Sequence, residues 1–389
     1  MICYNQTWVN NLLLINEIEK GHKDGIIPNN ELENIKREYP VGFYTPTLFI
    51  RIGLFVLTIV ISLFSSALLS VIMMEAKIID SYGWLIFLGI LHYIVLEVVV
   101  RDKNHYRSGV DDALLWISGT FWAVALFWAF SKDNTANYMG VSAILCLLSL
   151  FLTNRFYDML MSLIAYLSCF AFVFFAWQKV GSFGTAAMPF ILLFFSLAFY
   201  MVVKRNLTNV KVLFYKNCMT VLQVISLITL YLSCNYYVVK ELGDMLNGIV
   251  SKSIPLSWFF WLWTIILPIG YIAFGIFKKD VVRLRTGLLL VVMAALTFRN
   301  YYYLLPIELT LTICGVVLLA ISYYLIRYLN TPKHGFTYQE PKNPDLMDKA
   351  KIESLIISES FSESPVSPTN TDSIFGGGHF GGGGANSGF

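Results

Sequence analysis

The chain has 389 residues, of which 57% are hydrophobic and only 14% are charged. Soluble proteins carry about 25% charged residues, so this composition indicates a membrane protein. The formal net charge of +3 is small and spread along the sequence, which argues against the clustered basic face of a nucleic-acid-binding protein.

Residues 1–47 precede the first apolar segment and are rich in Asn, Glu and Lys. No cleavable signal peptide is recognisable there, so we expect the first span to act as its own insertion signal. The segment 7–20 places four apolar residues on one helical stripe: Trp8, Leu12, Ile15 and Ile18. A second short helix is expected with Asn30 as its N-cap, Glu33 three residues on, and Pro40 as its stop. This helical hairpin is either a cap packed on the bundle or membrane surface, or a docking site for a cytoplasmic partner.

Ten segments are long and apolar enough, or nearly so, to cross a membrane. A helix that spans ~30 Å of hydrocarbon needs roughly 20 mostly apolar residues. The sequence therefore predicts an all-α, polytopic transmembrane bundle over 48–330, because lipid leaves no partner for free backbone groups and no alternating barrel pattern occurs. The expected spans are 52–74, 82–100, 112–130, 138–153, 159–177, 186–203, 219–239, 255–277, 286–305 and 307–327.

The distribution of basic residues predicts the orientation. Loops that follow even-numbered spans contain twelve Lys and Arg residues, and those that follow odd-numbered spans contain six. Because basic residues accumulate in cytoplasmic loops, we expect both termini in the cytoplasm. Three tryptophans near the external end of the eighth span fit an interfacial aromatic belt: Trp258, Trp261 and Trp263.

His92 and Glu97 lie within the second span. His92 falls within a residue or two of the bilayer middle, where ionisable side chains are costly and are often functional. A neutral imidazole can instead be satisfied by a carbonyl and a hydroxyl on a neighbouring helix. Glu97 lies one helical turn before Arg101, a spacing typical of an ordinary interfacial ion pair.

Arg299 and Pro268 are the other candidates within spans. Arg299 lies about 20 Å along the ninth span if that span begins at Thr286. Its long side chain can extend to the outer interface, or it can pair with Glu308. Pro268 frees a backbone carbonyl in the eighth span and often marks a kink.

Two basic loops share the pattern [KR]-D-x4-R-[ST]-G. Ser108 and Thr286 are predicted to cap the helices that follow, with Asp111 completing a capping box after Ser108. Arg107 and Arg285 are expected at the lipid headgroups. Either two positively charged loops converged on capping chemistry, or the chain contains a parallel internal repeat of the kind found in transporters. The matching residues are Arg101, Asp102, Arg107 and Gly109 in one loop, and Lys279, Asp280, Arg285 and Gly287 in the other.

The segment 331–389 turns polar and ends in "FGGGHFGGGGANSGF", so a flexible tail is expected. These glycines do not form a phosphate loop, because no strand precedes them and no Lys-Ser/Thr follows. The sequence lacks H-E-x-x-H, Walker and G-x-S-x-G motifs, and its external loops hold only scattered acids. We assign no catalytic, cofactor-binding or metal residue, and an enzyme is the weakest class.

The stretch "EIEKGHKDGIIPNNELENIKREYP", followed by a series of spans and the basic "RDKNHYRSGVDDALL", resembles bacterial multi-span membrane proteins of unknown function. Members of these families carry a short helical hairpin before the bundle. The glycine-rich ending is also similar to endings of several bacterial membrane proteins. The resemblance implies a bacterial cytoplasmic membrane and supplies no catalytic residue.

Two functional hypotheses follow. The first is a non-enzymatic scaffold or regulator that engages a cytoplasmic or membrane protein through residues 1–40 or the tail. The second is a permease for a small or lipidic solute that uses His92, with Arg299 and the kink at Pro268. The sparse buried charge favours the first over ion coupling. The expected surroundings are the lipid bilayer and a protein partner, with no nucleic acid and no cofactor.

Overall fold

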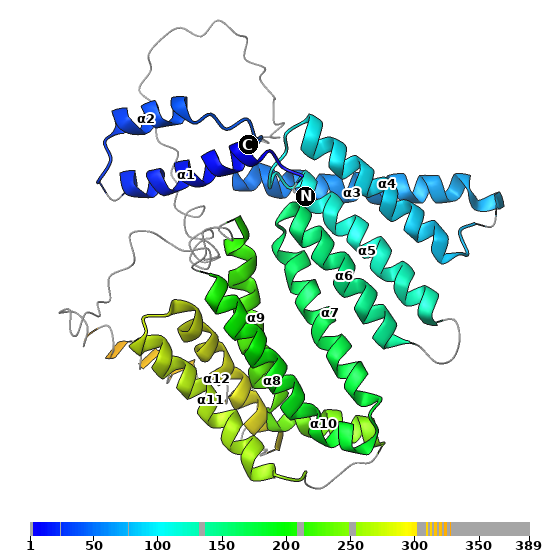
Figure 1. Cartoon of the computed structure of the whole chain (residues 1–389), viewed down its shortest axis with the longest axis vertical. Coiled ribbons are helices and arrows are strands. Elements are labelled where there is room, and N and C mark those ends of the chain that lie inside the picture. Colours follow the sequence, from blue (N-terminus) through cyan, green and yellow to red (C-terminus); the bar gives the residue numbers. More distant parts are fainter. Residues whose placement is uncertain are drawn as a thin grey trace, which may run out of the picture. The chain divides into compact units, whose positions relative to one another are not determined.

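The described part of the chain is all-α, with twelve α-helices, one short 3-10 helix and no β-strand (Figure 1). The computed structural model describes residues 3–23, 25–76, 78–131, 137–207, 214–248 and 254–301, with isolated positions between 309 and 327. The predicted tail, 331–389, lies outside these residues. The helices are α1 (Gln6–Lys23), α2 (Asn29–Glu38), α3 (Leu48–Ile72), α4 (Tyr82–Asp102), α5 (Val110–Ser131), α6 (Tyr138–Phe156), α7 (Met159–Gln178), α8 (Ser182–Asn206), α9 (Lys216–Ser233), α10 (Tyr236–Asn247), α11 (Ser257–Phe277) and α12 (Val281–Tyr301).

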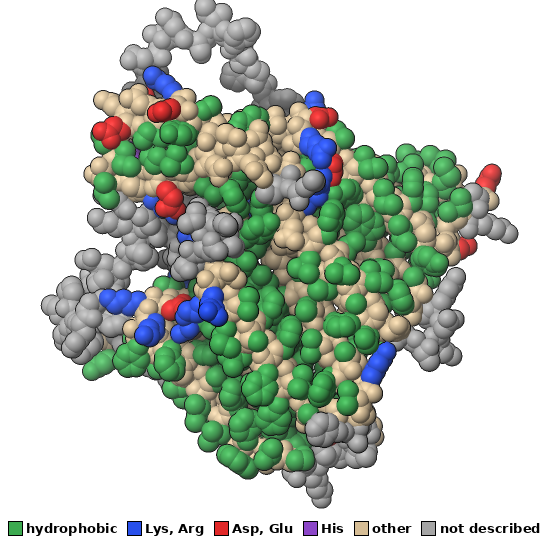
Figure 2. Space-filling view, viewed as in Figure 1, with side chains coloured by type: hydrophobic (Ala, Val, Ile, Leu, Met, Phe, Trp, Pro, Cys, Tyr) green, Lys and Arg blue, Asp and Glu red, His purple; other side chains and the backbone are tan. Residues whose placement is uncertain are grey.

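Among the described residues, nine helices are long and apolar enough to cross a membrane: α3 to α9, α11 and α12. They correspond to nine of the ten predicted spans, so the all-α, multi-pass membrane class is confirmed. Only isolated positions of the tenth expected span, 307–327, are among the described residues. Figure 2 shows hydrophobic side chains over much of the visible surface, with most charged side chains gathered near helix ends. Such a surface suits contact with lipid.

The seventh span is shorter than predicted. The expectation of one helix over 219–239 was wrong, because α9 ends at Ser233 and α10 begins at Tyr236. The Asn235 side chain accepts hydrogen bonds from the N–H groups of Tyr237, at 3.0 Å, and Val238, at 3.2 Å. Asparagine at an N-cap satisfies the first free N–H groups of a new helix, so it starts α10 and ends the continuous span.

The ninth span begins five residues earlier than predicted, at Val281. The Asp280 carboxylate accepts the N–H of Arg283 at 3.2 Å, so Asp280 caps α12. Thr286 therefore lies inside the helix, where its hydroxyl donates to the Val282 carbonyl at 2.8 Å. The prediction that Thr286 caps this helix was wrong.

The two helices expected before the first span are present as α1 and α2. The predicted cap at Asn30 was wrong, because α2 begins at Asn29 after Pro28 and no side chain caps it. α1 is anchored at its start, where Tyr4 and Val9 are 7% and 3% exposed and belong to a core cluster with residues of α4 to α7. α2 contains no buried residue.

Consecutive spans pack in pairs: α4 with α5, α6 with α7, α8 with α9, and α11 with α12, while α7 also contacts α8 and α9. The turns after α4, α6 and α11 and the C-terminal end of α8 carry most of the basic loop residues, and we call this end of the bundle the basic end. Contacts between these segments join them: the rings of Tyr157 and Tyr215 lie 4.6 Å apart, and Lys204 lies 3.8 Å from Asp280.

Gly109, just before α5, has a φ of +93°, and a Cβ added there would overlap the backbone carbonyl of Arg51. We expect Gly109→Ala to lower the free energy of unfolding by more than about 1 kcal/mol, because left-handed backbone is strained for L-residues. Thermal unfolding of the full chain in a nonionic detergent measures this. Gly53→Ala in α3 is the matched control, since nothing lies within 4 Å of its added Cβ. Equal melting temperatures for the two variants would contradict the argument.

Candidate functional site

A pocket of about 480 Å³ lies at the basic end, between the nearby halves of α3, α5, α7 and α9. We call it the basic-end pocket. Its size falls within the roughly 300–1,000 Å³ that is typical of ligand sites. Its walls are mainly apolar, and five charged residues line it: Arg51, Arg107, Asp111, Asp112 and Asp158.

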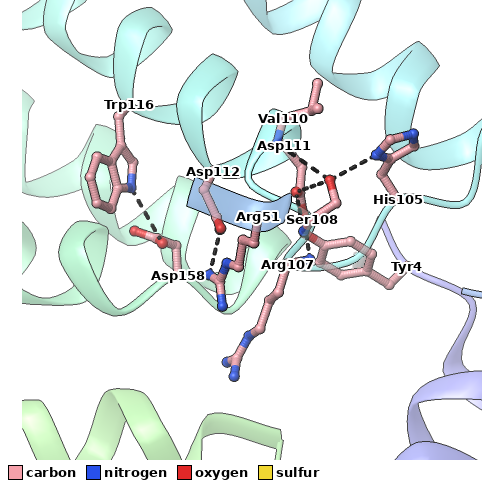
Figure 3. Close-up of polar contacts among 10 residues, drawn as sticks. All are labelled: Tyr4, Arg51, His105, Arg107, Ser108, Val110, Asp111, Asp112, Trp116 and Asp158. Atoms are coloured by element: carbon pink, nitrogen blue, oxygen red, sulfur yellow. Dashed lines mark hydrogen bonds and ion pairs between the residues drawn. The ribbon is translucent and has the colours of Figure 1, made fainter. Parts of the chain in front are cut away.

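Asp111, at the start of α5, is 2% exposed and accepts four hydrogen bonds (Figure 3). The N–H groups of Arg107 and Ser108 donate at 2.8 Å each, the Ser108 hydroxyl at 2.9 Å, and the Tyr4 hydroxyl at 3.3 Å. Burial and the nearby Asp111 charge raise the pKa of Tyr4 well above its ordinary value, so Tyr4 stays protonated and can donate. The positive end of the α5 dipole also favours a carboxylate here. The predicted pairing of Ser108 with Asp111 is confirmed.

Ser108 also accepts hydrogen bonds, from His105 Nδ1 at 2.7 Å and from the Val110 N–H at 3.3 Å. The order is carboxylate, serine, histidine, whereas in a hydrolase triad the histidine lies between the other two. Ser108 is 0% exposed and donates its own proton to Asp111, so it is not placed to attack a substrate. This group of side chains fixes the loop.

The other two carboxylates of the pocket also have partners (Figure 3). Asp112 accepts a hydrogen bond from Arg51 of α3 at 2.6 Å. Asp158 caps α7 by accepting the Met161 N–H at 2.7 Å, and it accepts Trp116 Nε1–H at 3.4 Å. Burial raises the pKa of Asp158 above its ordinary value, although these donors oppose the shift. Both aspartates stand at helix starts, which is the sequence signal that could have identified them.

Arg107 differs from its neighbours in the pocket. Its backbone lies in the left-handed region, with φ +49°, and its N–H is fixed by Asp111. The guanidinium carbon lies 5.6 Å from the centre of the Tyr106 ring. Among the described residues, no acceptor lies within hydrogen-bonding or ion-pair distance of this guanidinium. The Arg107 charge opposes the burial that raises the pKa of Asp158, but its guanidinium N–H groups have no hydrogen-bond acceptor among the described residues.

Glu97 forms the predicted ion pair with Arg101, at 3.3 Å. It has two further partners that the sequence did not indicate: Arg155 Nε of α6, at 2.8 Å, and the Tyr93 hydroxyl, at 2.6 Å. Cys3 joins the same region, because its N–H donates to the Arg155 carbonyl at 3.2 Å. Glu97 therefore ties α4 to α6.

His92 is 6% exposed, and its Nδ1 lies 2.8 Å from the Leu88 carbonyl, one turn earlier in α4. Its ring lies 5.4 Å from that of Phe121 in α5. The structure thus gives His92 a partner within its own helix, where the sequence suggested a neighbouring one. His92 does not line the basic-end pocket, and the structure does not bring it together with Glu97.

Arg299 lies in the last turn of α12, which ends at Tyr301. Its Nε is buried without an acceptor among the described residues, and Glu308, its predicted partner, lies outside them. Pro268 is fully buried in α11, which continues helical on both sides of it. A second intramembrane proline, Pro189 in α8, was missed.

The two loops that share a sequence pattern do not share a local structure. Gly109 lies in a loop with positive φ, whereas Gly287 lies inside α12 against Tyr271 and Ile272 of α11. Asp102 is exposed near the end of α4, whereas Asp280 caps α12. Arg101 lies in the last turn of α4 and Arg107 in the loop after it, whereas Lys279 lies in the turn before α12 and Arg285 in α12 itself. Convergence on capping chemistry thus explains Asp280 and Asp111 better than an internal repeat does.

We expect Asp111→Asn to lower the free energy of unfolding by about 2 kcal/mol, because the new amide N–H₂ faces a backbone N–H and leaves it unpaired. Thermal unfolding and the rate of trypsin cleavage after Lys103 and Arg107 measure the effect. Asp102→Asn is the control, since Asp102 is exposed. Equal cleavage rates in the two variants would contradict an anchoring role for Asp111.

Thiol labelling tests whether water reaches His92. In a chain whose six native cysteines are replaced, we expect His92→Cys to resist a polar, membrane-impermeant maleimide from both faces, because the site is packed. Lys103→Cys, on an exposed loop, is the positive control and should react from one face only. Labelling of His92→Cys in folded protein would mean that α4 borders a water-filled path.

No protein-family model matches the chain, and neither the curated proteins nor the solved structures include a match to it. Its function must be inferred from the chemistry of its own residues. The basic-end pocket and the segment that Tyr4 anchors beside it are the most distinctive features of the described part.

Proposed function

We propose that the chain is a multi-pass protein of a bacterial cytoplasmic membrane that acts without catalysis, as a scaffold or regulator, with both termini in the cytoplasm. The nine apolar helices of the described residues support the multi-pass class. The bacterial location is what the family resemblance implies. The excess of Lys and Arg in the loops of the basic end supports a cytoplasmic position for that end.

The unequal anchoring of the N-terminal hairpin carries this proposal. At the base of the hairpin, Tyr4 is buried and donates to Asp111. α2 contacts α1, where Lys36 pairs with Glu19 at 2.7 Å, and it has no buried residue of its own. A ten-residue helix is marginal in isolation, so α1 supports its order. An ordered helix that adds little to the core suits contact with a partner protein.

The exposed charge of α2 indicates the chemistry of that partner. Glu31, Glu33 and Glu38 are exposed acids on this helix. Lys36 is engaged by Glu19, which leaves Arg37, 3.8 Å from Glu33, as the other basic residue. The exposed surface of α2 therefore carries more acidic than basic side chains, and we expect the partner to present basic residues.

The alternative function, a permease for a small or lipidic solute, has one observation in its favour, the basic-end pocket. His92 does not line this pocket and is bonded within α4. A solute path that begins at this pocket would lie between α3, α5 and α7, and His92 would not line its entrance.

Crosslinking in the native membrane, followed by purification through a C-terminal tag, tests the scaffold role. We expect the triple variant Glu31→Lys, Glu33→Lys and Glu38→Lys to lose a partner that the parent chain retains. Its melting temperature should not change, because these side chains are exposed. The control variant, Glu75→Lys with Asp80→Lys, reverses the charge of two exposed acids beyond the other end of the bundle and should keep the partner. Partner recovery that is equal in both variants, or absent from the parent, would contradict the proposal.

A further inference from the structure

Among the described residues that line the basic-end pocket, the Arg107 guanidinium lacks a hydrogen-bond acceptor, whereas each of the three carboxylates accepts at least one hydrogen bond. Asp111 accepts four hydrogen bonds, Asp112 is paired with Arg51, and Asp158 accepts two N–H groups. The Arg107 guanidinium keeps its N–H donors without an acceptor among the described residues. A cationic ligand would have to displace existing donors from a carboxylate, whereas an anion would satisfy groups that are already free.

The backbone at Arg107 is fixed before any ligand arrives. Asp111 holds the N–H groups of Arg107 and Ser108, and the positive φ of Gly109 lets the loop approach Arg51 closely. Figure 3 shows the Arg107 side chain extending away from Asp111, with its guanidinium clear of the drawn contacts. The fixed backbone sets where the side chain of Arg107 starts, and the planar guanidinium fork matches the oxygens of a phosphate.

The rest of the pocket suits an acyl chain. Leu48 and Ile52 of α3 line it, as do Leu160 and Leu163 of α7. Leu48 is 47% exposed and Ile52 is 53% exposed, so this wall continues onto the outer face of α3. Of the nine spans that the structure describes, α3 is the least buried, and its outer face suits contact with lipid. The pocket thus places the Arg107 guanidinium, near the ends of the spans, next to the apolar side chains of α3, which would face the acyl chains of the membrane.

We propose that the basic-end pocket binds an anionic acyl lipid with a terminal phosphate, with Arg107 contacting the phosphate and the apolar walls of α3 and α7 receiving the chain. Guanidinium hydrogen bonds to the phosphate give the site its preference for an anion. The apolar walls give it a preference for an amphiphile over a free anion. The site does not depend on the proposed role of the N-terminal hairpin, because a scaffold and a permease could both carry it.

Thermal unfolding of the purified full chain in dodecyl maltoside tests the site. Lysophosphatidic acid should raise the melting temperature saturably, whereas inorganic phosphate and lysophosphatidylcholine should not. We expect Arg107→Gln to weaken the response to lysophosphatidic acid by at least roughly tenfold in concentration, because the charged hydrogen bonds are lost. Lys103→Gln removes one exposed positive charge from the same loop and should respond like the parent chain.

Ile52→Trp fills the apolar side of the pocket and tests the site if Arg107→Gln fails to fold. It should abolish the response to lysophosphatidic acid while the protein still unfolds cooperatively. An equal response in the parent, Arg107→Gln and Ile52→Trp would overturn the proposal. A response of the parent to inorganic phosphate that matches its response to lysophosphatidic acid would also overturn it, and would assign Arg107 to a free anion.

Discussion

The buried carboxylate of Asp111 is the constraint on which the basic end depends. A charge removed from water costs several kcal/mol unless donors replace the water. Here the donors come from two different segments: Tyr4 near the N-terminus, and Arg107 and Ser108 in the loop before α5. The hydrogen bonds to Asp111 therefore hold the segment around Tyr4 against the bundle and fix the loop before α5. The left-handed backbone conformation of Arg107 lies within this set of bonds.

A second pair of charges defines the outer wall of the pocket. α3 is the least buried span, and α5 is the span it packs against. Apolar contact with a single neighbour is no more favourable than contact with lipid tails, so packing alone fixes the position of α3 weakly. The hydrogen bond from Arg51 to Asp112 adds a directional link between α3 and α5, close to the first residues of both helices. Asp111 and Asp112, adjacent in sequence, thus hold the loop on one side and α3 on the other.

Sequence spacing anticipated the contacts that are local along a helix and missed those between distant segments. Ser108 with Asp111 and Glu97 with Arg101 lie three and four residues apart, and both pairings are present. Arg155 is 58 residues from Glu97, so its contact depends on how α4 and α6 pack, which span length does not specify. The break at Asn235 had a local signal, a capping residue, but the apolar run around it predicted one continuous span.

Polarity within a span is a weaker guide to function than an unmatched donor or acceptor. His92 was prominent because ionisable groups in lipid are costly, yet one bond to the Leu88 carbonyl removes much of that cost. Tyr166, Ser196 and Thr229 likewise bond one another between α7, α8 and α9. A polar group whose bonds are complete has little free energy to gain from a ligand. The Arg107 guanidinium can still form hydrogen bonds, and it lines a pocket large enough for a ligand. The basic end is therefore a stronger candidate for a functional site than His92.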